Sequence, residues 1–195
     1  TTRAHLAQLV ISGDLSTVYV DNVYFYKQGG GTATQPTTPA PTPTFPAGNV
    51  ISLFSDAYTN VPVDTWRTDW SSAVLTDVNI AGNPTKKYSQ LDFVGIETVN
   101  NQLDISSMTN FHIDVWSPDF TLFGVKLVDF GADGAFGGGD DVEHQVDFNS
   151  PVKGGWVSLD IPLSDFTGLT TKNHIAQYIL IGQPTGTTTV YVDNV

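Results

Sequence analysis

Cysteine is absent from the 195-residue chain, and cationic residues are scarce. Without cysteine neither a disulfide nor a thiolate metal site can form, so cysteine usage does not fix the redox compartment. Lys and Arg together number 8 against 20 Asp and Glu, giving a formal net charge of −12. Because binding to a phosphate backbone requires clustered Lys and Arg, this charge balance excludes nucleic acid as a partner.

Long apolar runs are also missing. No stretch approaches the roughly 20 apolar residues that span a bilayer, so the sequence predicts no membrane segment. No signal peptide is present either, but the chain begins with Thr1 instead of Met, so an amino-terminal leader could have been cut away.

Helical periodicity is the third absence. No stretch holds a helical pattern over about ten residues, whereas short runs of alternating apolar and polar residues recur between Gly, Pro, Asn and Asp. This pattern predicts an all-β fold, an antiparallel β-sandwich of jelly-roll type. The predicted strands are 50–54, 77–80, 91–97, 111–116, 123–130, 144–148, 157–161, 175–181 and 190–195.

An internal repeat divides the chain. Residues 17–23 are identical to residues 189–195, and residues 1–8 match residues 170–177 closely. Such self-similarity is typical of tandem modules. We therefore expect residues 1–27 to be the C-terminal hairpin of a preceding homologous module, residues 28–48 to be a Gly/Thr/Pro linker, and residues 49–195 to be the complete β-sandwich module. The orphan hairpin is expected to pair with a sheet edge or to exchange between molecules.

The run 111–116 carries the first candidate site. Its alternation places Phe111, Ile113 and Val115 on one face and the polar or indole side chains on the other. An indole can stack on the apolar face of a sugar ring while neighbouring polar groups bond its hydroxyls. The candidate ligand residues on that second face are His112, Asp114 and Trp116, with a purely structural histidine as the alternative for the first.

A second candidate site lies in the loop 58–70. Trp66 and Trp70 stand there among charged residues, with Arg67 between them. Two indoles in a polar loop are either platforms for sugar rings or lids over the open end of the sandwich.

An acid-rich, glycine-rich loop at 129–144 is the candidate metal site. Ca²⁺ takes six to eight oxygen ligands from a backbone that can curl, and this loop offers both acids and glycines. A solvated acidic turn and a direct ligand role are the alternatives. We expect a structural calcium ion in this loop. A further acid pair near the first and last strands would close a second structural site, with an exposed strand-end turn as the alternative. The candidate metal ligands are Asp133, Asp140, Asp141, Glu143, Asp56 and Asp193.

Catalytic motifs are not found. The sequence has no HExxH, no Gly-rich phosphate loop, no recognisable Ser/His/Asp setting and no paired-Glu glucanase strand. We therefore expect no enzymatic activity from this chain.

Several blocks resemble an accessory module found in marine bacterial laminarinases and other secreted glycan-degrading enzymes. They are 50–58, 63–66, 86–88, 92–97, 112–119, 126–131 and 161–166. The resemblance implies a non-catalytic carbohydrate-binding module with a β-sandwich fold, structural calcium and a β-1,3-glucan ligand such as laminarin. It also implies secretion, a tandem homologous module and a tethered glycoside hydrolase as partners. The alternative is a calcium-dependent structural or adhesion repeat without a sugar site.

Overall fold

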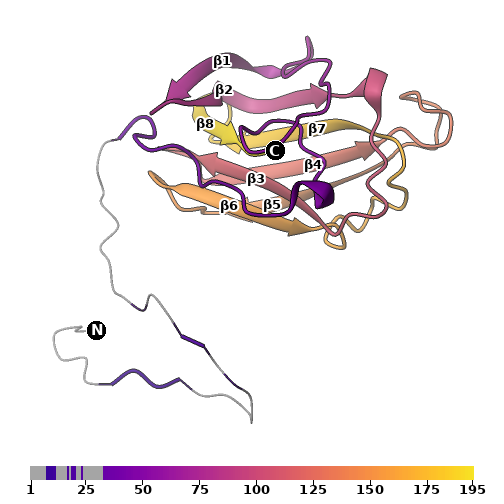
Figure 1. The fold of residues 1–195 in the computed structure, drawn as a ribbon. Coiled ribbons are helices and arrows are strands. Elements are labelled where there is room, and N and C mark those ends of the chain that lie inside the picture. The colour runs from indigo at the N-terminus through magenta and orange to yellow at the C-terminus, as the bar shows by residue number, and fades with distance from the viewer. Residues whose placement is uncertain (1–7, 12–16, 18, 21–22, 24–32) are drawn as a thin grey trace.

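The computed structural model describes residues 8–11, 17, 19–20, 23 and 33–195 of the chain, and their regular secondary structure is almost entirely β-strand (Figure 1). Among these residues there is no α-helix and no helix long and apolar enough to cross a membrane. The elements are η1 (Ala47–Asn49), β1 (Ser72–Ile80), β2 (Asn83–Glu97), η2 (Val99–Asn101), β3 (Asn110–Trp116), β4 (Leu122–Asp129), β5 (Val142–Asn149), β6 (Trp156–Pro162), β7 (Ile175–Gln183) and β8 (Thr188–Asp193).

The strands form an antiparallel β-sandwich, as the sequence predicts. The strand order is β5-β4-β7-β2-β8-β3-β6, with β1 paired to β2. The long strand β2 belongs to both layers, because its register shifts between Tyr88 and Leu91. Before the shift it pairs with β8, and after the shift residues 93–97 pair with β7. One layer is therefore β1-β2-β8-β3-β6, and the other is β2-β7-β4-β5.

The core lies between the two layers. Ile113 and Val115 of β3 and Phe123, Val125 and Leu127 of β4 are all 0% exposed, so the inward faces predicted from the alternation are confirmed. Each buried aliphatic or aromatic side chain of this kind stabilises the fold by about 1.5–3 kcal/mol relative to leaving it in water. The outward faces of the two layers thus point away from each other, on opposite sides of the sandwich.

One predicted segment differs from the structure, and a second lies mostly outside the described residues. The run 50–54 is not a regular strand, since only an isolated bridge joins Ser52 to Asn60. Its backbone is instead held by the chain end, with the Leu53 and Phe54 amides donating to the Val195 carbonyl. Most residues of the predicted hairpin 1–27 lie outside the described part of the chain, so its docking stays a prediction.

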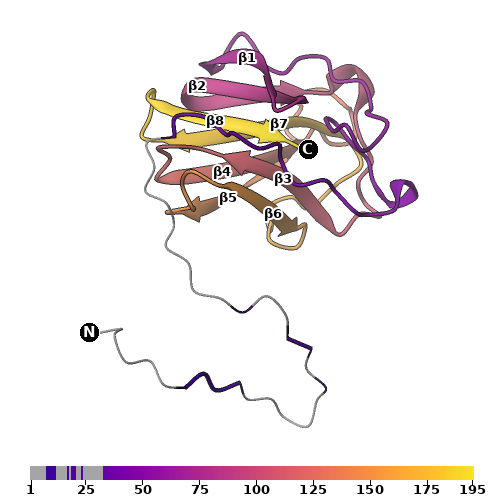
Figure 2. The same cartoon turned by 60° about the vertical axis from the view of Figure 1, so that its left-hand side comes forward.

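Part of the predicted linker lies on the sandwich. Residues 34–45, here called the strap, run along the outer face of β8, β3 and β6, as Figures 1 and 2 show. Pro36 and Ala40 of the strap are buried there. The strap therefore covers one outer face of the molecule, which decides which predicted site residues are open to a ligand.

Candidate functional site

Trp116 points outward from β3, as its parity predicts, but it is only 3% exposed. Its ring meets that of Tyr191 edge-on, with ring centroids 5.4 Å apart and planes at 84°. It belongs to a small buried cluster with Tyr191 and Ile80, and half-buried Trp156 packs against that cluster. A buried indole cannot offer its face to a sugar ring, so the structure gives Trp116 a packing role beneath the strap.

Asp114 and His112 join the same covered face. Asp114 is 1% exposed and accepts hydrogen bonds from the Asn194 amide at 2.8 Å and from the Ser158 hydroxyl. The His112 Nδ1 lies 2.7 Å from an Asp160 oxygen. The Asp114 carboxylate, whose Oδ2 lies 3.6 Å from His112 Nε2, raises the pKa of His112 above its ordinary value of 6.5, and Asp160 adds to this effect. Both side chains are committed to contacts within the protein.

A cavity of about 720 Å³ opens between this face and residues 41–55. His112, Asp114 and Asp160 line it on the polar side, while Ile105 and Met108 belong to its apolar wall. Its volume lies within the range of small-molecule pockets. The cavity is therefore one place where a ligand could contact predicted site residues, here His112 and Asp114.

Trp66 and Arg67 support their loop from within. Trp66 packs against the core and meets Phe54 edge-on at 5.4 Å between ring centroids. The Arg67 guanidinium donates only to backbone carbonyls, those of Ala73 at 2.7 Å, Ser71 at 3.3 Å and Thr68 at 3.4 Å. Arg67 therefore fixes the turn that carries Trp70 and is not free to bind a ligand.

Trp70 is the predicted aromatic that the structure leaves open, with 46% of its surface exposed. Its ring stacks on Phe93 of β2, with centroids 6.1 Å apart and planes at 21°. Its six-membered ring also lies over Gly95, where an added Cβ would come within 2.0 Å of the Trp70 Cη2. The absence of a side chain at residue 95 thus lets the indole lie against the sheet.

Around Trp70 the outer face of the second layer carries both apolar and polar side chains. The register places Phe93, Ile181, Gly124 and Asp147 in one row across β2, β7, β4 and β5. The next row holds Gly95, Ile179, Lys126 and Gln145, and the third holds Glu97, Gln177, Val128 and Glu143. We call this surface the Trp70 face; its side chains are those of Trp70, Phe93, Ile179, Ile181, Lys126, Gln145, Asp147, Glu97 and Glu143, with Gln177 and Val128 of the third row buried.

Hydrogen bonds order the polar part of the Trp70 face. Lys126 Nζ donates to Glu143 at 2.7 Å and Gln145 Nε2 donates to Asp147 at 2.6 Å. Gly124 keeps this region low, since a Cβ there would lie 2.6 Å from the Asp147 carboxylate. An aromatic pair beside aliphatic residues and a row of donors and acceptors suits a ring that has apolar faces and hydroxyl edges. Phe93 was not among the residues predicted to bind a sugar, and neither were the hydrogen-bonded polar side chains of Lys126, Gln145, Asp147 and Glu143, which we call the polar row.

The acid loop does not show a preformed metal cage. In the described part of the chain, no three His, Asp or Glu side chains are grouped closely enough to hold a metal ion. Asp140 accepts the amides of Ala132 and Asp133, the latter bond contributing most to lowering the pKa of Asp140. Asp141 accepts the Gly137 amide through Oδ2. Glu143 points elsewhere, to Lys126 on the Trp70 face.

One carboxylate oxygen of that loop lacks a hydrogen-bond donor, and two others lie close to Gly138. Asp141 Oδ1 is buried and has no hydrogen-bond partner. Asp133 Oδ2 and Asp140 Oδ1 both face Gly138, at 2.2 Å and 2.8 Å from where its Cβ would be. These oxygens fit a hard cation chemically, although other oxygens of the same carboxylates are bound by the loop backbone.

The second predicted acid pair is Asp56 and Asp193. Asp193 is 1% exposed, and burial raises its pKa to about 6, with Asp56 adding a smaller repulsion. Both of its oxygens accept hydrogen bonds, one from the backbone N–H of Asn194 at 2.8 Å and the other from the side-chain amide of Asn83. Asp56 itself is exposed. This arrangement is that of a hydrogen-bonded buried acid.

Comparison with known proteins gives a likeness of fold. No family model matches the chain, and no curated protein matches it by sequence. Among solved structures, it is similar to the family 30 carbohydrate-binding module of the cellulosomal cellulase Cel9D-Cel44B of Clostridium thermocellum, with a TM-score of 0.56, 15% identity, and coverage of 74% of this chain and 94% of that chain.

Two further solved structures share the fold. Another family 30 carbohydrate-binding module matches with a TM-score of 0.55 and 14% identity over 74% of this chain and 84% of that chain. The family 11 carbohydrate-binding module of the cellulase Lic26A-Cel5E of Clostridium thermocellum matches with a TM-score of 0.50 and 14% identity, over 73% of this chain and 90% of that chain. The chain therefore has the β-sandwich architecture of carbohydrate-binding modules.

Proposed function

We propose that this chain is a non-catalytic carbohydrate-binding module and that the Trp70 face binds the glycan. The observation that carries the proposal is the exposed Trp70 ring, stacked on Phe93 and fixed by the Arg67 turn beside ordered polar side chains. A rigid aromatic anchor binds with little loss of conformational freedom, which favours affinity. The fold shared with carbohydrate-binding modules supports the same class.

The proposed ligand is a β-glucan, with β-1,3-glucan such as laminarin first, as the resemblance of the sequence blocks implies. The residues proposed to hold hydroxyl groups are Lys126, Gln145 and Asp147, because their polar atoms lie next to the aliphatic strip of Ile179 and Ile181. In the complete protein the module would tether a secreted glycoside hydrolase to its substrate, and a tandem copy would add avidity through effective concentration.

Isothermal titration of the full chain with laminarin and with a mixed-linked β-glucan tests this function. Trp70→Ala is expected to remove binding, whereas Phe45→Ala should leave it intact, since Phe45 is 64% exposed but borders the cavity on the other layer. Loss of binding in Phe45→Ala alone would move the site to the cavity. Silence of the unmodified chain toward every glycan on an array would favour a structural or adhesion repeat. Release of reducing sugar would contradict the non-catalytic role.

We also propose that the acid loop holds a structural calcium ion, without a role for the ion in sugar contact. The support is chemical: Asp141 Oδ1 is buried without a donor, and two further oxygens face Gly138. A ligand that binds only the folded state stabilises it by RT ln(1 + [L]/Kd). Adding calcium to protein that was first freed of metal with EDTA should therefore raise its melting temperature, and Asp141→Asn should reduce that rise.

A further inference from the structure

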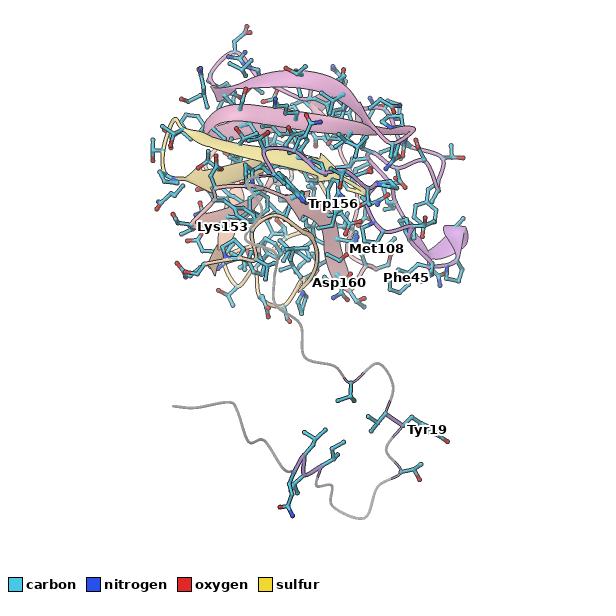
Figure 3. The ribbon with its side chains drawn as sticks, turned by 90° about the vertical axis from the view of Figure 1, so that its left-hand side faces the viewer. Tyr19, Phe45, Met108, Lys153, Trp156 and Asp160 are labelled. Carbon is cyan, nitrogen blue, oxygen red and sulfur yellow. The ribbon has the colours of Figure 1, made fainter. Side chains whose placement is uncertain are left out.

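The Thr/Pro strap contacts the sandwich through its backbone. Trp156 Nε1 donates to the Thr38 carbonyl at 2.8 Å, the Asn194 amide donates to the Pro41 carbonyl at 2.9 Å, and the Tyr191 hydroxyl donates to the Thr34 carbonyl at 3.4 Å. The donors come from β6, β8 and the residue after β8. Figure 3 shows Trp156 and Asp160 of β6 on this side of the molecule and Phe45 at the end of the strap.

The side chains of the strap divide by position. Pro36 and Ala40 are buried against the sandwich, while Thr37, Thr38 and Thr42 are exposed. The sandwich therefore binds the strap by hydrogen bonds to its backbone carbonyls, and the small apolar side chains of Pro36 and Ala40 pack against the sandwich. Beneath them lies the aromatic cluster of Trp116 and Tyr191, which are 3% and 2% exposed.

Donors to backbone carbonyls above an aromatic floor are also what proteins use to bind Pro-rich segments. A Pro-rich segment has no internal hydrogen bonds, so its carbonyls stay available, and prolines hold it extended before it binds. Aromatic surfaces with donors at their edges take up such segments at a small entropic cost. The outer face of β8, β3 and β6 combines an indole donor, a phenol donor and an amide donor with a buried aromatic floor.

We propose that the outer face of β8, β3 and β6 is a built-in docking surface that holds a Thr/Pro segment by its backbone carbonyls, and that its occupant is the chain's own residues 34–45. The strap is then a bound ligand held in cis and not a free spacer. It enters the module on the layer opposite the Trp70 face, so that whatever precedes it is attached on the far side from the proposed sugar surface. The inference does not depend on the proposed function, because it uses only contacts of the opposite layer.

Spin labelling of the full chain tests the proposal. Since the protein has no cysteine, Thr37→Cys gives a single labelling site at an exposed position of the strap. The nitroxide is expected to show the slow motion of a docked segment. Trp156→Phe, which keeps a ring but removes the indole donor, and Ala40→Asp, which buries a charge, should each increase the mobile fraction severalfold.

Two controls make the result specific. Thr38→Ala keeps the carbonyl that Trp156 binds and removes only an exposed side chain, so the label should stay slow. Trp70→Ala lies on the opposite layer and should also leave the label slow. A nitroxide already in fast motion in the unmodified chain would overturn the proposal. Slow motion that persists in both Trp156→Phe and Ala40→Asp would overturn the proposed docking contacts, since neither the indole donor nor the buried Ala40 would then matter.

Discussion

Replacing Gly95 by alanine tests the geometry of the Trp70 face at one methyl group. The new Cβ would lie 2.0 Å from Cη2 and 2.4 Å from Cζ2 of Trp70, whereas carbon atoms in contact prefer about 3.5–4.0 Å. To relieve this overlap the ring must move by more than about 1 Å, which it cannot do while it stays stacked on Phe93 over Gly95. We expect the indole to leave the sheet surface.

The expected loss is that of an aromatic anchor. Removing such a residue costs about 2 kcal/mol or more in binding free energy, which is about 30-fold in Kd. Stability should hardly change, because the strand gains about 0.5–1 kcal/mol from alanine over glycine and loses about 0.5–1.5 kcal/mol of ring stacking. Binding and folding are thereby separated.

Titration calorimetry with laminarin at fixed salt, next to a thermal melt, measures both effects. Gly48→Ala is the matched control, since nothing lies within 4 Å of its added Cβ. The reasoning is refuted if Gly95→Ala binds laminarin as tightly as the unmodified chain while Trp70→Ala does not bind. In that case Trp70 would act from a position other than the one over Gly95.

Three further predictions concern the turn held by Arg67, the His112–Asp160 pair and the acid loop. Arg67→Lys should weaken laminarin binding severalfold although Trp70 is retained, because the single ammonium nitrogen does not reproduce the planar fork whose three nitrogens reach three separate carbonyls; unchanged calorimetry would contradict this. The pKa of His112 is raised in the folded state, so its stabilising effect is complete below pH 6.5 and lost as the pH rises through the folded pKa. Asp160→Asn should lower that pKa in an NMR titration, with a stability effect well under about 1 kcal/mol because Asp160 is largely exposed. Chelation with EDTA should lower the melting temperature of the protein, and equal melting temperatures in EDTA and in calcium would contradict the proposed calcium site.

The sheet could be predicted from the sequence because its signal is local. Alternation assigned Phe111, Ile113 and Val115 to the core, and all three pack there. The first half of β2 escaped prediction, since Lys86 and Lys87 interrupt the apolar alternation there. The run 50–54 has a strand-like composition but is held by the chain end, which is a tertiary contact that no local pattern contains.

The site could be predicted only in part. Parity placed Trp116 on an outer face, but whether that face is open depends on the strap, which lies far away in the sequence. Trp70 was a candidate from its polar loop, while its neighbours Phe93 and Gly95 come from β2 and are set by strand register. One local signal was available for the polar row: Glu143, Gln145 and Asp147 alternate with apolar residues along β5.

NMR shift mapping of the isotopically labelled full chain with a laminarin oligosaccharide tests the central claim most directly. The account predicts saturable shifts of the Trp70 indole N–H and of amides in β4, β5 and β7, with the Trp156 indole N–H under the strap unmoved. Shifts centred on His112 and the cavity, or on the strap, with Trp70 unmoved, would contradict it.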